Sequence, residues 1–547
     1  MSLLRLDIAG MTCTHCATTI AEALKKLPGV AARVSYADRA AYIEALGQNS
    51  VPAILEAIEA VGYRAQPDTD PARSQGPTRK ARSDGLDIAI IGSGSAAFAA
   101  ALRATESGAQ VTMVESGVLG GTCVNVGCIP SKILIRAALT AHEQARPRFR
   151  GLKPQRPVID WSLLAAQQQE RVEELRVAKY QDILDHNPNI RLLRGRARFL
   201  DAHSLLVDTH ETTPVLIKAD RFLVATGASA HVPAIPGLST TPYWTSTNAL
   251  TCLERPNHLV IIGGSVIAVE LAQAFLRLGS QVTLLARHTL LSREDRDIGG
   301  TLQAALKAEG MAIHIDAEVT AVAYHHETFT VTTATGEIHS DRLLIATGRR
   351  PNTGSLGLDV AGVQQDHDGH IVVDDHLRTH VAHIYAAGDC TALPQFVYVA
   401  ASAGTRAATN MTGGDEALDL TPMPTVVFTD PQIATVGLSV DSAKARGISA
   451  EERTLTLDHV PRALVNFDTS GFIRLVAEKA SGRLIGARIV SAEAGEMIQS
   501  VALAMRGGLT INDLATQLFP YLTMVEGIKL CAQTFNKDVR QLSCCAG

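Results

Sequence analysis

The sequence has no apolar run of the roughly 18 residues that a membrane-spanning helix needs. The longest candidate, LDIAIIGSGSAAFAAALRA at residues 86–104, is interrupted by glycines. The first residues, MSLLRLDIAGMTCTHC, lack an apolar core followed by a cleavage site, which argues against a secretory signal. We therefore expect a cytoplasmic protein without membrane insertion.

Charge and aromatic side chains are also limited. The formal net charge of the 547-residue chain is −5, so we expect neither nucleic acid nor an anionic membrane as a partner. Aromatic residues make up 4% of the chain and apolar residues 46%, which is typical of a large α/β protein rich in alanine, valine and leucine. This length predicts about three to four domains.

Cysteines are few, but most of them are paired in the sequence. Scattered structural disulfides are not expected in a reducing compartment. Six of the nine cysteines form three close pairs: Cys13 and Cys16, Cys123 and Cys128, and Cys544 and Cys545. Paired thiols in a cytosolic chain indicate redox chemistry or binding of a soft metal.

The pattern of predicted elements divides the chain into six segments. Residues 1–66 have the order βαββα, with a last strand at YRAQ, which predicts a small ferredoxin-like βαββαβ domain. Residues 67–84 are rich in proline, glycine, serine and charge, so we expect a flexible linker. The remaining predicted limits are 85–237 and 238–353 for two Rossmann-type α/β domains, 354–421 for a central segment, and 422–547 for an α+β domain.

The first Rossmann-type unit contains the fingerprint Gly92-x-Gly94-x-x-Ala97 between a strand and a helix. The first glycine permits a tight turn, the second lets the backbone approach a pyrophosphate, and the small alanine allows close packing of helix on strand. Glu115 ends the second strand, where a carboxylate can bond ribose hydroxyls. We predict a bound dinucleotide here, and a glycine-rich turn without a ligand is the alternative.

The second unit has a looser fingerprint, Gly263-x-Ser265-x-x-Ala268. Its second strand ends in ARHTLLSRED, where an NAD site would carry an acid. A 2′-phosphate requires cationic partners instead, which favours NADPH over NADH, whereas the alternative is a solvated basic turn. The candidate partners are Arg287, His288 and Arg293.

The motif GGTCVNVGCIPSK at residues 120–132 follows the first fingerprint. Cys123 and Cys128, separated by four residues at a predicted helix start, can close a disulfide. The helix N-terminus can also stabilise a thiolate. A zinc site would need two more ligands, and no cysteine or histidine lies close by in sequence.

This motif, with LLIATGRRPN at 343–352 and IYAAGDC at 384–390, resembles the pyridine nucleotide-disulfide oxidoreductases over residues 85–547. That resemblance implies a homodimeric flavoenzyme with FAD at the first fingerprint, contacted by Gly121, Thr122 and Asp389. It also implies that 354–421 contacts FAD and that 422–547 is the dimerisation domain.

The same resemblance assigns roles to the residues around the cysteine pair. Cys128 would be the charge-transfer thiolate near the flavin, and Cys123 the thiol that meets the substrate. Lys132 and Glu270 would pair beside the flavin ring. Electrons would pass from NADPH through FAD to the two cysteines and then to the substrate.

One departure from the family is informative. Disulfide-reducing members carry a His-Pro step near the C-terminus whose histidine, backed by a glutamate, supplies a proton to the leaving thiolate. The sequence LFPYLTMVEG places Phe519 at the histidine position and Met524 at the glutamate position. Either the enzyme is inactive, or its substrate requires no proton from the protein. Reduction of thiol-bound Hg(II) to Hg(0) fits the second case.

Cys544 and Cys545 stand side by side near the C-terminus. Such a dithiol can take a thiophilic ion and pass it to the inner pair by ligand exchange, and incidental thiols are the alternative. This tail and the missing histidine resemble the mercuric reductases, which implies delivery of Hg(II) thiol complexes to a site shared between subunits. Tyr180 and Tyr521 would line that site, although the residues alone favour ordinary packing.

GMTCTHC at residues 10–16 resembles the heavy-metal-associated domain. We expect Cys13 and Cys16 on a loop before a helix, where two thiolates can bind one soft ion in near-linear geometry. Copper chaperones share the motif, so it does not identify the metal. Two other functions stay open: a disulfide reductase with a C-terminal dithiol, as in some thioredoxin reductases, and a metal-binding protein with a vestigial reductase body.

Overall fold

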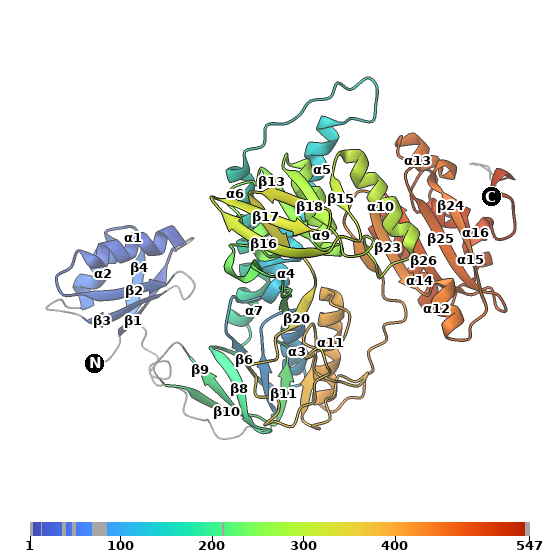
Figure 1. Ribbon diagram of the computed structural model, residues 1–547. Coiled ribbons are helices and arrows are strands. Elements are labelled where there is room, and N and C mark those ends of the chain that lie inside the picture. The colour runs from blue at the N-terminus through green and yellow to red at the C-terminus, as the bar shows by residue number, and fades with distance from the viewer. Residues whose placement is uncertain are drawn as a thin grey trace. The chain divides into compact units, whose positions relative to one another are not determined.

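The computed structural model describes residues 4–11, 14–35, 40–45, 51–67, 85–209 and 213–541. The chain divides into two compact units, Met1–Asp84 and Gly85–Gly547 (Figure 1). Cys13, Cys544, Cys545 and all of the predicted linker except Pro67 lie outside the described residues.

The N-terminal unit has the expected βαββαβ order. Its antiparallel sheet has the strand order β2-β3-β1-β4. Alternation in β1 buries Leu6 and Ile8, and helical spacing buries Ile20 and Leu24 beside them. The elements are β1 (Leu4–Ala9), α1 (Thr14–Lys25), β2 (Ala31–Ser35), β3 (Ala40–Ala45), α2 (Val51–Glu59) and β4 (Arg64–Pro67). β4 thus includes Pro67, the first residue of the predicted linker.

We predicted Cys16 on a loop before the first helix, and this prediction is wrong. α1 begins at Thr14, so Cys16 lies in its first turn. Cys16, Ile20 and Leu24 are buried at 8%, 0% and 0% exposure. This i, i+4, i+8 spacing places the thiol on the core face of the helix.

The first domain of the second unit is built on a parallel sheet in the order β21-β11-β5-β6-β7. α3 and α11 lie side by side (Figure 1), and a Cβ at Gly404 would lie 2.1 Å from Ala96 O. That approach requires glycine. The elements are β5 (Asp87–Ile91), α3 (Ser95–Glu106), β6 (Gln110–Glu115), β7 (Ile190–Arg194), β8 (Arg196–Asp201), β9 (Ser204–Asp208), β10 (Val215–Lys218), β11 (Arg221–Val224), β21 (Ile384–Ala386) and α11 (Val397–Met411).

The second parallel sheet has the order β15-β14-β13-β19, and β12 pairs with β20 between the two nucleotide-binding domains. This arrangement confirms two Rossmann-type units. The elements are β12 (Ala228–Ala230), η2 (Leu238–Thr240), α8 (Ser246–Leu250), β13 (His258–Ile262), α9 (Val266–Arg277), β14 (Gln281–Leu285), α10 (Arg296–Glu309), β15 (Ala312–His314), β16 (Val319–His325), β17 (Thr328–Thr333), β18 (Gly336–Ser340), β19 (Arg342–Ile345) and β20 (Arg349–Pro351).

A separate helical layer carries the paired cysteines. It consists of α4 (Gly121–Val126), α5 (Cys128–Ala145), α6 (Trp161–Arg176), a π-helical turn η1 (Val177–Gln181) and α7 (Asp182–Asp185). Gly121–Ala145 is long and apolar enough to cross a membrane by length and composition alone. Leu134 and Ala138 of α5 are buried in one apolar core with residues of α9.

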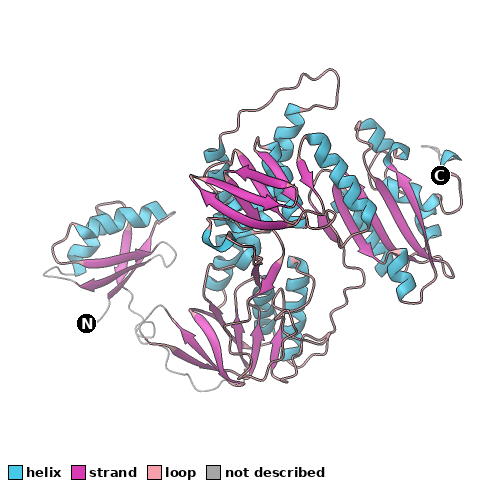
Figure 2. Cartoon of the chain, viewed as in Figure 1, coloured by secondary structure: helices cyan, strands magenta, loops and turns pink. Residues whose placement is uncertain are grey.

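The C-terminal domain is an antiparallel sheet in the order β22-β23-β26-β25-β24, with helices beside it (Figure 2). The predicted α+β class is confirmed. The elements are β22 (Thr425–Val427), β23 (Gln432–Gly437), α12 (Val440–Ala445), β24 (Ala450–Thr456), η3 (Leu457–His459), α13 (Pro461–Val465), β25 (Phe472–Glu478), β26 (Leu484–Ser491), α14 (Ala494–Arg506), α15 (Ile511–Thr516), α16 (Glu526–Gln533) and η4 (Val539–Gln541).

Candidate redox and nucleotide-binding site

The cysteine pair sits where α4 meets α5. Cys123 lies in the first turn of α4, and Cys128 is the first residue of α5. Gly127 separates the helices, and a Cβ there would lie 2.8 Å from Thr122 O and 3.2 Å from the Cα of Cys123. A larger residue would therefore push the two cysteines apart. Both thiols are free, half-buried and hydrogen-bonded to each other.

The two thiols differ strongly in acidity. The hydrogen bond from Cys123 and, to a smaller extent, the Lys132 ammonium lower the pKa of Cys128 to about 7, against the opposing effect of burial. The same hydrogen bond, together with burial, raises the pKa of Cys123. A single thiolate near pH 7 therefore resides on Cys128. The roles predicted for the two cysteines require this order of acidity.

Lys132 and Glu270 meet as predicted, although they are 138 residues apart. Lys132 Nζ lies 2.9 Å from Glu270 Oε2, and the Glu270 side chain is only 5% exposed. Phe428, which follows β22, supports both groups. Its backbone N–H donates to Glu270 Oε1 at 2.9 Å, and its ring centroid lies 4.4 Å from Lys132 Nζ. Sequence patterns gave no signal for Phe428.

Tyr180 lies beside the cysteine pair, on the π-helical turn η1. Burial raises the pKa of its hydroxyl, and electrostatic interaction with the cysteine pair raises it further. Its ring packs edge-on against Phe98 at 4.8 Å. A Cβ at Gly120 would touch the Tyr180 ring at 3.2 Å. Tyr180 is therefore packed in the protein core and also lies close to the two thiols.

Tyr521 is 55% exposed between α15 and α16 in the C-terminal domain. Nearby, Phe519 packs against the core of that domain, and Met524 is buried. Glu526, which the sequence reasoning missed, is also buried, and its Oε2 accepts from Leu522 N at 3.3 Å. Residue 519 therefore offers an apolar ring, which cannot donate a proton.

The first fingerprint forms a cradle that only glycine permits. Gly92 has φ +115°, and a Cβ there would lie 2.3 Å from Ala225 O. A Cβ at Gly121 would lie 2.7 Å from Gly94 Cα, so the glycine turn and the start of α4 are in close contact. Ala97 is fully buried. These features fit a pyrophosphate approached by backbone alone.

Glu115 closes the side of this cradle at the end of β6. Its Oε2 accepts from Ser93 Oγ at 2.6 Å, and its Oε1 accepts from Gly117 N at 2.5 Å. Ser93 Oγ also accepts from Gly120 N at 3.2 Å. The carboxylate is thereby held next to the glycine turn, in the position expected of a ribose ligand.

Asp389 lies in a buried polar cluster that also fits a large polar cofactor. Burial raises the pKa of Asp389, and Arg349, 3.6 Å away, opposes that effect. Thr226 Oγ1 and Arg349 Nε are buried without a hydrogen-bond partner in the part of the chain that the structure describes. Unpaired buried polar atoms are costly, so FAD suits this site. The repeated Ala-Thr-Gly at 225–227 and 346–348 was an available signal for both residues.

The second fingerprint is built in the same way. A Cβ at Gly263, where φ is +138°, would lie 2.1 Å from Ala346 O. Ser265 Oγ donates to that oxygen at 3.3 Å, and Ala268 is fully buried. The cationic residues predicted to bind a 2′-phosphate are exposed on the loop after β14, and they are Arg287, His288 and Arg293.

Comparison with known proteins places this arrangement in a family. Residues 86–404 match the pyridine nucleotide-disulphide oxidoreductase family, and residues 423–532 match its dimerisation domain. The chain belongs to the pyridine nucleotide-disulphide oxidoreductases. Residues 5–64 match the heavy-metal-associated domain. The family and the N-terminal domain expected from the sequence motifs are thus confirmed.

Relatives of this oxidoreductase place it more narrowly. A mercuric reductase of Shigella flexneri is 55% identical over 99% of this chain and 100% of its own. A mercuric reductase of Acidithiobacillus ferrooxidans is 54% identical over 99% of this chain and 98% of its own. The resemblance to mercuric reductases is therefore confirmed. Among solved structures, a Cu(II) complex of the flavoprotein disulfide reductase RclA from Escherichia coli is 32% identical, with a TM-score of 0.74 over 83% of this chain and 100% of that chain.

Proposed function

We propose that this oxidoreductase reduces Hg(II) to Hg(0) with electrons from NADPH. The observation that carries the proposal is the full-length similarity to mercuric reductases, including the N-terminal metal-binding domain. The geometry agrees with it: two adjacent free thiols, of which Cys128 is acidic, and an apolar Phe519 suit a soft metal better than a disulfide.

Two cofactor sites follow from the donor sets. The glycine cradle, Glu115 and the Asp389–Arg349 cluster would hold FAD, which when bound relays two electrons from NADPH to the cysteine pair. The second glycine turn would hold NADPH. Its 2′-phosphate would be bound by Arg287, His288 and Arg293.

In the chemical step, the two cysteines would hold Hg(II) as a dithiolate complex. Two electrons reduce the metal to Hg(0), both mercury–sulfur bonds break, and the thiolates of Cys123 and Cys128 are left behind. No proton is consumed, so a phenylalanine at position 519 is compatible with turnover. Lys132, which is paired with Glu270, stabilises the Cys128 thiolate.

The match to the dimerisation domain fits a homodimer. We infer that the C-terminal segment of each subunit serves the cysteine pair of the other. Cys544 and Cys545 would take Hg(II) from thiol complexes and transfer it inward, with Tyr180 and Tyr521 beside the path. Cys13 and Cys16 would capture the same ion. Free paired thiols are stable in a reducing compartment, so the protein would act in the cytoplasm.

One assay separates this function from the two others considered. NADPH oxidation is followed with Hg(II) in excess thiol, with oxidised glutathione or thioredoxin, and with no acceptor. We expect fast oxidation with Hg(II) only, with Hg(0) collected as vapour. Faster oxidation with a disulfide would make the protein a disulfide reductase, and no oxidation with any acceptor would make it a metal-binding protein.

A further inference from the structure

The loop between β14 and α10 carries Arg287, His288 and Arg293, and it is held at its middle and at its C-terminal end. At the middle, the N–H of Leu291 donates to Gly264 O at 2.8 Å, which ties the loop to the second glycine turn. Leu291 is buried and adopts φ +49°, a left-handed conformation that is unfavourable for leucine. The glycine turn therefore determines where the first half of the loop lies.

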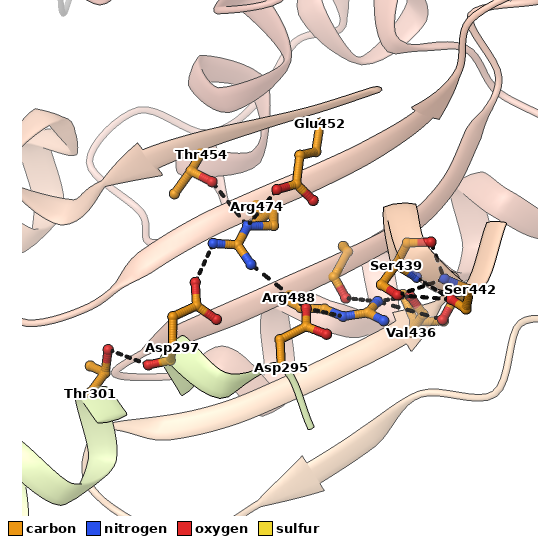
Figure 3. A network of polar contacts seen from close by, with 12 residues as sticks. Asp295, Asp297, Thr301, Val436, Ser439, Ser442, Glu452, Thr454, Arg474 and Arg488 are labelled. Atoms are coloured by element: carbon orange, nitrogen blue, oxygen red, sulfur yellow. Dashed lines mark hydrogen bonds and ion pairs between the residues drawn. The ribbon is translucent and has the colours of Figure 1, made fainter. Parts of the chain in front are cut away.

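The other end is held by the C-terminal domain through two arginines (Figure 3). Arg474 of β25 forms an ion pair with Asp297, in the first turn of α10, and lies 3.6 Å from Asp295 Oδ2. Arg488 of β26 places Nε 3.3 Å from the same Asp295 oxygen, although without hydrogen-bond geometry. Asp295 and Asp297 follow Arg293 by two and four residues.

Strand alternation explains why these arginines reach the second nucleotide-binding domain. Ile473, Leu475, Ala487 and Ile489 pack with α14 and α16 on one face of the sheet. Successive side chains on a strand point to opposite faces, so Arg474 and Arg488 belong to the other face. Phe472 and Val490, on that face, share a core with residues of α9 and α10, including Ala274, Ile298 and Leu302.

The arginines are shielded and multiply bonded, so they are not mobile surface charges. Their side chains are 13% and 9% exposed. Arg474 Nε also donates to Thr454 Oγ1 at 3.0 Å, and Arg488 Nη1 donates to Val436 O at 3.2 Å. Loss of Arg474 would remove this cationic partner of Asp297, and loss of either arginine would remove one of the two cations beside Asp295, which favours a shift of the loop.

We propose that Arg474 and Arg488 are positioning residues for the 2′-phosphate site: they fix the loop that presents Arg287, His288 and Arg293 to the dinucleotide. This inference rests on the NADPH preference proposed above. The dimerisation domain would thereby set nucleotide selectivity within its own chain, at residues that never touch the nucleotide.

The test measures binding of 2′,5′-ADP and of 5′-AMP to the FAD-loaded enzyme by calorimetry, so the readout is independent of turnover. Arg474→Met should weaken 2′,5′-ADP roughly 2- to 30-fold, as expected for indirect coupling, and leave 5′-AMP nearly unchanged. Arg474→Lys should restore part of the loss. The KM for NADPH should rise while that for NADH does not.

Arg453→Met is the matched control. Arg453 is also an arginine of this sheet, but it pairs with Glu451 at 3.5 Å and lies over the Phe535 ring, both within the C-terminal domain. It should leave both ligands unaffected. If Arg474→Met misfolds, Asp297→Asn removes the same ion pair from the other side and should give the same selective loss.

Two further variants separate the possible failures. Arg293→Met should itself weaken 2′,5′-ADP selectively, and Arg474→Met should then add little in that background. If Arg293→Met and Arg287→Met both fail to discriminate the two ligands, the proposed NADPH site is wrong. If they discriminate but Arg474→Met and Asp297→Asn do not, or weaken both ligands equally, the positioning role alone is overturned.

Discussion

The acidity of Cys128 provides the sharpest test of the redox site. Its thiol has a pKa of about 7, against an ordinary value of 9.0, and the hydrogen bond from Cys123 is the largest cause, followed among the lowering effects by Lys132. At pH 7 half of Cys128 is thiolate, whereas at a pKa of 9.0 only about 1% would be. The surroundings of Cys128, in which these two supports outweigh burial, therefore change the thiolate population by roughly 50-fold.

Two substitutions separate the contributions of Lys132 and Cys123 to the lowered pKa of Cys128. Lys132→Met removes the charge and Cys123→Ala removes the hydrogen bond, so both should move the Cys128 midpoint upward, Cys123→Ala further. Because the thiolate is the reactive form above its pKa, alkylation of the reduced enzyme should rise with pH around about 7 in the unmodified chain. The variant curves should be displaced to higher pH.

The assay is the rate of iodoacetamide labelling of the Cys128 peptide against pH, read by mass spectrometry. Burial raises the pKa of Cys252, Cys390 and Cys531 to about 11, 11 and 12, so these thiols should not be labelled appreciably below pH 9. Lys132→Arg keeps the charge and is the control. An unchanged midpoint in Lys132→Met, or an equal displacement in Lys132→Arg, would refute the electrostatic argument.

Further predictions concern the nucleotide, the N-terminal unit and the tail. Replacing Arg287 and Arg293 with methionine should raise the KM for NADPH far more than that for NADH, and equal effects would remove the 2′-phosphate argument. A chain that starts at Asp84 should keep FAD and reduce Hg(II) supplied with small thiols, and loss of turnover would show that the N-terminal unit is essential. Cys544→Ala/Cys545→Ala should slow reduction of thiol-complexed Hg(II) but spare a small halide complex. Equal rates of the variant and the intact enzyme with thiol-complexed Hg(II) would show that the tail delivers nothing.

Local sequence patterns predicted much of this protein. Strand–turn–helix patterns with glycines at fixed spacing indicated both nucleotide-binding units, and the spacing of Cys123 and Cys128 indicated a pair at a helix start. These predictions succeed because each depends on neighbours in the chain. Tyr180 shows the limit: it has an ordinary helical context in sequence, yet the π-helical turn η1 places it beside the thiols.

The contacts that sequence reasoning missed join residues far apart in the chain. Phe428 N donates to Glu270 across 158 residues, and Arg474 reaches Asp297 across 177. Strand alternation in the C-terminal domain predicts which side chains share a face, but it does not reveal what packs against that face. A single sequence carries no pairing information of this kind, so the support that the C-terminal domain gives to the site was not predictable.

That support is extensive along α9, the helix that presents Glu270 to Lys132. Gln273 and Arg277 follow Glu270 by three and seven residues, which places all three on one face of the helix. Each bonds the segment after β22: Glu270 to Phe428 N, Gln273 to both backbone groups of Asp430 at 2.8 Å, and Arg277 to the Asp430 carboxylate at 2.8 Å. A displacement of the C-terminal domain would therefore move the carboxylate that anchors Lys132 and, through Lys132, change the acidity of the Cys128 thiol. The domain that matches the family's dimerisation domain thus supports the redox pair of its own chain through α9 and the nucleotide loop through α10.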